Sequence, residues 1–210
     1  MEHGRHREQS PDNAARSPGC NQPSRAPRSR IFWLRMRERW GALQLAEYFA
    51  DDWARAEGSD GRVVEPGHQM EWAWILNEAR KLLSIDTSAE IRAAVAFAEK
   101  YGIDPETHIT YNRVRDDGVA IDKGSRVWPN TERLKSSIAL YELDGIDPAS
   151  VIDPTCRLLL DRYLAYGTPG TWMDAYDADG AAATTSVPAS TLYHLFLAFA
   201  EVLRISDQAD

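Results

Sequence analysis

The chain has 210 residues, of which 43% are hydrophobic, and a formal net charge of -8. This length fits one domain or one and a half with a real core, and the acidic balance argues against nucleic acid or a membrane surface as a partner. No stretch offers the roughly 20 apolar residues of a membrane helix, no apolar signal segment is visible, and Cys20 and Cys156 are too few for a disulfide framework. We therefore expect a soluble, cytoplasmic protein.

Residues 1–30 differ from the rest of the chain in composition. They contain six arginines and three acidic residues, many Pro, Ser and Asn residues, and almost no large apolar side chains. Such a segment buries too little surface to offset the entropy lost on ordering. We predict a disordered basic tail over residues 1–30 and a folded domain over residues 31–210.

Residues 31–107 are predicted to be mainly helical. A helix over 31–40 precedes a partly alternating stretch over 42–64, which reaches a turn signal at Asp60-Gly61. The next helix covers about 67–83. Thr87 or Ser88 is expected to cap a further helix that ends at Gly102, and its buried face is predicted to consist of Ile91, Ala94, Val95 and Ala98.

The remaining residues alternate between turns and helices. Asp117-Gly118 and Asp179-Gly180 are turn signals typical of β-hairpins. The predicted elements are, in order, a hairpin over 108–127, a helix over about 129–143, a helix from Pro148 to Tyr166, a hairpin over 171–187 and a last helix over about 189–205.

The same unit recurs three times: a helix, a hairpin with an Asp-Gly turn, a proline and a second helix. Pro66, Pro129 and Pro188 are 63 and 59 residues apart, and proline is favourable at a helix start. A repeat of this kind indicates stacked helical hairpins, in a solenoid or a closed α/α toroid. The helices that follow the prolines should begin at one end of the stack, where their polar groups can converge.

Polar side chains stand near each of these prolines: His68 and Glu71, then Trp128 and Glu132, then His194. His194 lies in an otherwise apolar helix, where it must find a partner or face a cavity. A core histidine and a simple helix-capping role for the carboxylates are the plainer interpretations. No metal-binding or phosphate-loop motif is present, whereas two imidazoles suit proton transfer near neutral pH.

Three segments resemble the N-acylglucosamine 2-epimerase family: EPGHQMEWAW (65–74), RVWPNTERLK (126–135) and GTWMDAYDADG followed by VPASTLYHLF (170–196). The resemblance implies an all-α fold, about half of an (α/α)6 barrel with short β-hairpins. It implies acid/base roles for His68 and His194 and a sugar or sugar-phosphate substrate, without a cofactor or a metal. The residues expected to bind the substrate are Glu71, Trp128 and Glu132. Asn130 stands where the family usually has Gln.

The resemblance covers residues 31–210, which match only the C-terminal half of the family. An arginine and a further histidine of the family's pocket have no counterpart, so we expect a truncated member with exposed apolar flanks that favour homo-oligomers. Ile31, Phe32, Trp33, Leu34 and Trp40 would lie at one flank, and Leu158, Leu159, Leu195, Phe196 and Phe199 near the other. Two other functions are an inactive scaffold that binds carbohydrate or protein, and a glycosidase with paired carboxylates.

Overall fold

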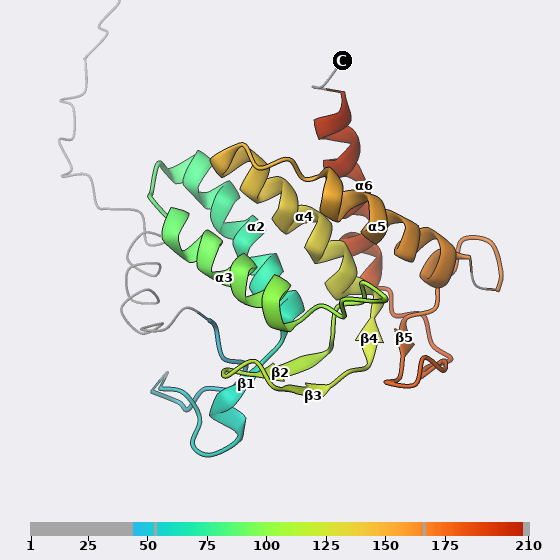
Figure 1. The fold of residues 1–210 in the computed structure, drawn as a ribbon, viewed down its shortest axis with the longest axis horizontal. Coiled ribbons are helices and arrows are strands. Elements are labelled where there is room, and N and C mark those ends of the chain that lie inside the picture. The colour runs from blue at the N-terminus through green and yellow to red at the C-terminus, as the bar shows by residue number, and fades with distance from the viewer. Residues whose placement is uncertain (1–43, 53, 166, 208–210) are drawn as a thin grey trace, which may run out of the picture.

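The computed structural model of the chain describes residues 44–52, 54–165 and 167–207. The predicted basic tail over 1–30 and the predicted helix over 31–40 lie outside these residues. Within them, helices form most of the structure, and the strands are short and gathered below the helices in Figure 1. The predicted all-α class with short strands between helices is confirmed. None of the described helices is long and apolar enough to cross a membrane.

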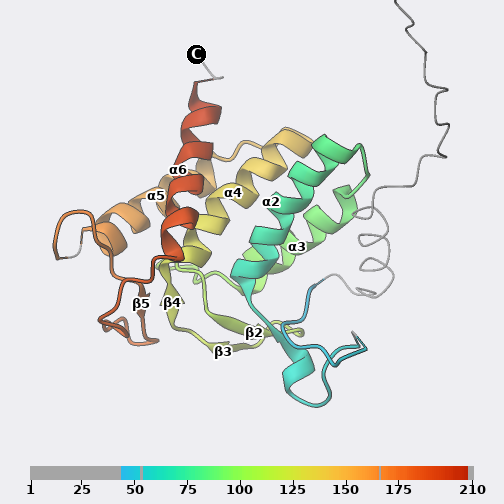
Figure 2. The ribbon, with the colours of Figure 1, turned by 180° about the vertical axis from the view of Figure 1, so that it is seen from behind.

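Three helices form one layer: α2 (Pro66–Leu83), α4 (Val127–Asp144) and α6 (Thr191–Ser206). α4 is central, because it packs against both of the others. All three helices begin at the end of the layer where the strands lie (Figures 1 and 2). The expected convergence of the three helix starts is therefore present in the structure.

A second layer covers this one. α3 (Ser88–Tyr101) packs against α2 and α4, while α5 (Ala149–Leu158) continues into a π-helical segment, η2 (Leu159–Leu164), beside α4. The predicted apolar face of α3 is buried and consists of Ile91, Ala94, Val95 and Ala98. The first three of these residues pack with Ala73 and Leu76 of α2. Two layers of helical hairpins arranged in this way make a partial helical toroid, about half of an (α/α)6 barrel.

Helix α4 is buried on every side over residues 129–139, although many of these residues are polar. The Arg133 guanidinium donates two hydrogen bonds of 2.8 Å to the Glu99 carboxylate, and the Ser136 and Ser137 hydroxyls donate to backbone carbonyls one turn earlier. Buried polar groups need such partners, and these bonds let a polar helix occupy the centre of the fold.

The strands form two small antiparallel sheets. One contains β1 (Val63–Val64), β2 (Arg113–Arg115) and β3 (Ala120–Asp122), in that order. β2 and β3 make the predicted hairpin, whose turn includes Gly118 with a φ of 88°. The other sheet pairs β4 (Ser125–Arg126) with β5 (Ala175–Tyr176).

Three local predictions need correction. The predicted hairpin over 171–187 is reduced to a turn and one bridge, Tyr176 to Ala182, because β5 pairs with β4 instead. Asp60-Gly61 lies in a short 3-10 helix, η1 (Asp60–Arg62), not in a hairpin turn. Thr87 is the N-cap residue of α3 as predicted, but its hydroxyl donates to the Leu76 carbonyl of α2 at 3.0 Å and makes no hydrogen bond to the helix it precedes.

Candidate active site

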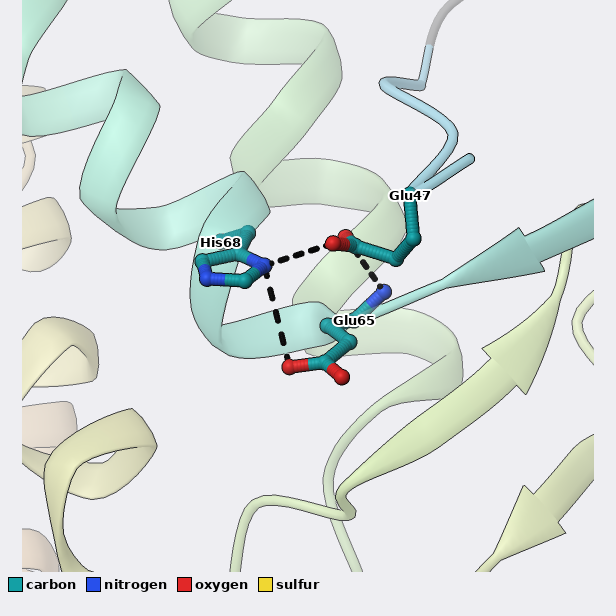
Figure 3. A group of neighbouring side chains, drawn as sticks. All are labelled: Glu47, Glu65 and His68. Atoms are coloured by element: carbon teal, nitrogen blue, oxygen red, sulfur yellow. Dashed lines mark hydrogen bonds and ion pairs between the residues drawn. The ribbon is translucent and has the colours of Figure 1, made fainter. Parts of the chain in front are cut away.

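His68 lies in the first turn of α2, and two carboxylates face its Nδ1 atom (Figure 3). Glu47 Oε2 is 2.8 Å from Nδ1, which is a hydrogen bond, whereas Glu65 Oε2 is 3.7 Å away. Burial of the ring lowers the pKa of His68, but the hydrogen bond to Glu47 and the charges of Glu47, Glu65 and Glu71 outweigh it, so the pKa is raised. Carboxylates near this ring therefore favour its protonated form.

Glu65 is the buried residue just before α2, and two arginines hold its carboxylate. Arg126 donates to Oε2 at 2.7 Å and Arg113 donates to Oε1 at 3.3 Å. The Glu65 backbone N–H in turn donates to Glu47 Oε1 at 3.1 Å (Figure 3). Glu47 is thus fixed at one oxygen by the backbone, and its other oxygen orients the His68 ring.

His194 lies in the first turns of α6 and is buried. Its Nδ1 atom is 2.5 Å from Glu132 Oε1 of α4, and the Glu132 side chain is fully buried. The partner that an imidazole in an apolar helix requires is therefore this carboxylate. A carboxylate on Nδ1 fixes the ring orientation and leaves Nε2 for another partner.

Trp128, the second residue of α4, lies between the two histidines. Its ring centroid is 4.9 Å from that of His68 and 5.2 Å from that of His194. Gly67 makes room for the indole, since a Cβ atom at this position would lie 2.8 Å from Trp128 Cη2. One aromatic ring thus joins the two imidazoles into a single site.

Glu71 and Tyr193 complete the site. The Tyr193 hydroxyl is 3.5 Å from Glu71 Oε1, and its ring centroid is 3.8 Å from that of His194. Burial, and then the charges of Glu71 and Glu132, raise the pKa of Tyr193 to about 12. The hydroxyl therefore stays protonated at neutral pH and can donate a hydrogen bond.

The structure brings all five sequence-predicted site residues together at the starts of α2, α4 and α6: His68, Glu71, Trp128, Glu132 and His194. Sequence reasoning missed four others: Glu47, Glu65, Arg126 and Tyr193. Glu65, Arg126 and Tyr193 lie within the three quoted segments, so their position in the chain was a usable signal. Glu47 comes from an irregular segment with no pattern that marks it.

Two groups of side chains have ligand atoms close enough to hold a metal ion. These atoms lie within 4.8 Å of one another in Glu47, Glu65 and His68, and likewise in Glu71, Glu132 and His194. In each group a protein cation already contacts one carboxylate, Arg126 at Glu65 and Lys135 at Glu132. The positive charge that a metal would bring is thus partly supplied by the chain itself.

Fold and geometry together define a partial helical toroid with two histidine–carboxylate pairs at one end of its inner helices. A model of the N-acylglucosamine 2-epimerase (GlcNAc 2-epimerase) family matches residues 30–198. The chain therefore belongs to this family, as its resemblance indicated.

Individual relatives agree with the family and the fold. The chain is 35% identical to "Mannose-6-phosphate isomerase" of Rhizobium meliloti (strain 1021) over 162 residues, which are 75% of this chain and 42% of the relative. A D-mannose isomerase structure matches with a TM-score of 0.69 and 18% identity over 89% of this chain and 52% of that one. The structure of cellobiose 2-epimerase from Spirochaeta thermophila DSM 6192 matches with a TM-score of 0.60 and 15% identity, over 87% of this chain and 51% of that one. The chain thus spans about half the length of the proteins it resembles.

Proposed function

We propose that the chain is a sugar epimerase or isomerase in which His68 and His194 transfer protons at C2 of an opened sugar. The observation that carries this proposal is the pair of imidazoles on either side of Trp128, each with a carboxylate at Nδ1. Each carboxylate orients its ring and leaves Nε2 available to a bound molecule. Two such groups at one site are what a two-sided proton transfer requires.

The reaction proceeds in two proton transfers. One imidazole removes the proton from C2, and the C–H electron pair forms the C1–C2 double bond of an enediolate, with negative charge on O1. A proton then returns to the opposite face of C2 while O1 re-forms the C1 carbonyl, which gives the 2-epimer. Alternatively, the proton returns to C1 and the O2 hydroxyl proton passes to O1, so that C2 becomes the carbonyl of the ketose. Atoms and electrons balance without a redox cofactor or a metal ion.

The other side chains suit a sugar ligand. Trp128 offers a partly exposed aromatic surface for the apolar face of a sugar, and the Glu71 carboxylate can accept hydrogen bonds from hydroxyls. The names of the similar proteins support a mannose-type sugar, free or phosphorylated. We therefore propose a monosaccharide or monosaccharide phosphate as the substrate.

The two other functions make different demands on the site. A glycosidase needs a carboxylic acid that donates its proton to the leaving oxygen, but both oxygens of Glu132 face cationic or imidazole nitrogen atoms. A binding scaffold needs the pocket but neither imidazole. Turnover that depends on both histidines therefore distinguishes the proposed function from both.

Deuterium exchange tests this function. The chain is incubated in deuterated water with mannose or mannose 6-phosphate, and proton NMR follows loss of the C2 proton. His68→Gln and His194→Gln should each slow exchange by on the order of 100-fold or more, the scale of lost acid/base catalysis. His108→Asn, at an exposed position with a φ of 61° that Asn tolerates, is the matched control. Wild-type exchange rates in either glutamine variant would refute the proposal.

A further inference from the structure

Lys135 is a charged residue in the core that the proposed mechanism does not use. It lies on α4 one turn after Glu132, and it is 1% exposed. Lysine is almost never buried this completely unless it is paired, and removing an ammonium group from water costs several kcal/mol. A charge buried at such a cost must be compensated by the groups around it.

The contacts of Lys135 point to the active site. Its Nζ atom is 2.8 Å from Glu132 Oε2 and 4.4 Å from the centroid of the Trp74 ring. This contact is an ion pair and not a hydrogen bond. The other oxygen of the same carboxylate holds His194 Nδ1. Lys135, Glu132 and His194 therefore form a buried chain of contacts, an ion pair followed by a hydrogen bond, that ends at the imidazole.

We propose that Lys135 is a positioning residue that keeps Glu132 ionised and thereby leaves His194 Nε2 free to accept a proton. This inference rests on the proposed function, because a free Nε2 matters only if His194 acts as a base. Lys135 itself touches neither the substrate nor the reacting atoms. It acts through the carboxylate.

The positive charge of Lys135 affects how many protons the Glu132–His194 pair binds. Three other groups face His194: the Glu71 carboxylate from α2, the Trp128 ring from α4 and the ring of the neighbouring Tyr193. None of them is a cation, so Lys135 is the positive charge that balances Glu132 within the described residues. Without Lys135, binding of one more proton by the buried Glu132–His194 pair becomes more favourable, because a buried carboxylate without a balancing positive charge is high in free energy.

The extra proton blocks Nε2 wherever it resides. If the ring takes it, His194 becomes an imidazolium with a proton on both nitrogens. If Glu132 takes it, the carboxyl group donates to Nδ1, and the neutral ring must carry its proton on Nε2. In both cases the lone pair that would accept the substrate proton is absent. Removal of Lys135 therefore disables the base without touching the substrate.

The test reads the protonation of His194 directly. Nitrogen-15 NMR of histidine-labelled chain distinguishes a protonated from an unprotonated Nε2 atom, and His194→Gln assigns the signal. In Lys135→Met and Lys135→Gln, the pH at which Nε2 loses its proton should rise, because a nearby positive charge has been removed. Lys135→Arg, which keeps the charge, should move this pH less. An unchanged pH in either neutral variant would overturn the inference.

Two further readouts cover the other outcomes. If the neutral variants do not fold, nitrogen-15 signals of labelled lysine in the wild-type chain decide the matter: a Lys135 that is uncharged at pH 7 overturns the inference. If wild-type chain exchanges deuterium into sugar, Lys135→Met should lose rate at pH 7 with little change in KM, and recover as the pH rises. Absence of exchange in the wild type would refute the proposed function alone, because the histidine signals would still report on Lys135.

Discussion

The two histidines have the same kind of partner but different surroundings. His68 has 36% of its side chain exposed and faces three carboxylates, which raise its pKa. His194 is buried, and the carboxylate that holds it is itself balanced by Lys135. The two imidazoles therefore have different electrostatic surroundings, and the proposed division into acid and base roles requires a difference of this kind.

Glu47→Gln tests the tuning of His68. In the folded chain the pKa of His68 is raised, so the stabilisation from its protonated form is fully present below the unfolded value of about 6.5 and is lost as the pH rises through the folded value. The amide removes the charge and the hydrogen bond to a carboxylate, while burial still lowers the pKa. We expect the pKa of His68 to fall in histidine NMR titrations.

The free energy of unfolding should change with pH in the direction that the raised pKa of His68 implies. In urea melts at a series of pH values, wild-type chain should lose unfolding free energy on passing through the folded pKa of His68, and Glu47→Gln should lose less over that interval. Asp51→Asn, an exposed change in the same segment, should behave as the wild type. A variant curve parallel to that of the wild type would show that Glu47 does not tune His68.

Helix α4 carries the site because it is buried at the centre of the helical layer. Trp128 and Glu132 occupy its first turns and contact a histidine on each side, His68 from α2 and His194 from α6.

Asn130 fixes the start of this helix to the chain before it. Its side-chain oxygen accepts the Thr110 N–H at 2.9 Å, and its Nδ2 donates to the Arg126 carbonyl at 2.7 Å.

Asn130→Ala should destabilise the fold. It leaves the buried Thr110 N–H without its acceptor, and an unsatisfied buried group costs about 1–3 kcal/mol. Urea denaturation should show a loss of about 2 kcal/mol in unfolding free energy. Leu82→Ala, at a side chain of α2 that is 80% exposed, is the control and should change it by less than about 0.5 kcal/mol. Equal losses in the two variants would contradict this account of α4.

The helices could be predicted from sequence because their apolar periodicity and end signals are local. α2 ends at Leu83 and α4 at Asp144, close to the predicted limits. The pairing of β5 with β4 could not be predicted, since two-residue strands carry no register signal. The burial of Lys135 could not be predicted either, because a lysine in a helix ordinarily faces water. Only the packing of distant parts of the chain shows that it is buried.

One side of the whole molecule exposes apolar side chains on α6, which lies at the edge of the layer formed by α2, α4 and α6. Leu192 is 57% exposed, Phe196 is 70% exposed and Leu203 is 64% exposed, and their spacing places them on one helix face. The predicted flank was partly wrong: Leu159 and Leu195 belong to the core, while Phe196 is exposed. The other predicted flank, within 31–40, lies outside the described residues.

We expect this α6 face to hold a second copy of the chain. Exposed apolar patches favour association, and the chain spans about half the length of its toroidal relatives, so two copies could complete one ring. Light scattering after size-exclusion chromatography should give a dimer at tens of micromolar chain, or aggregates. Phe196→Lys and Leu203→Lys should shift the chain toward monomer, because a dry interface would have to bury the new charges. Leu82→Lys, an exposed apolar position on α2, should leave the dimer intact. A wild-type monomer that melts cooperatively and binds no hydrophobic dye would show that the α6 face needs no partner.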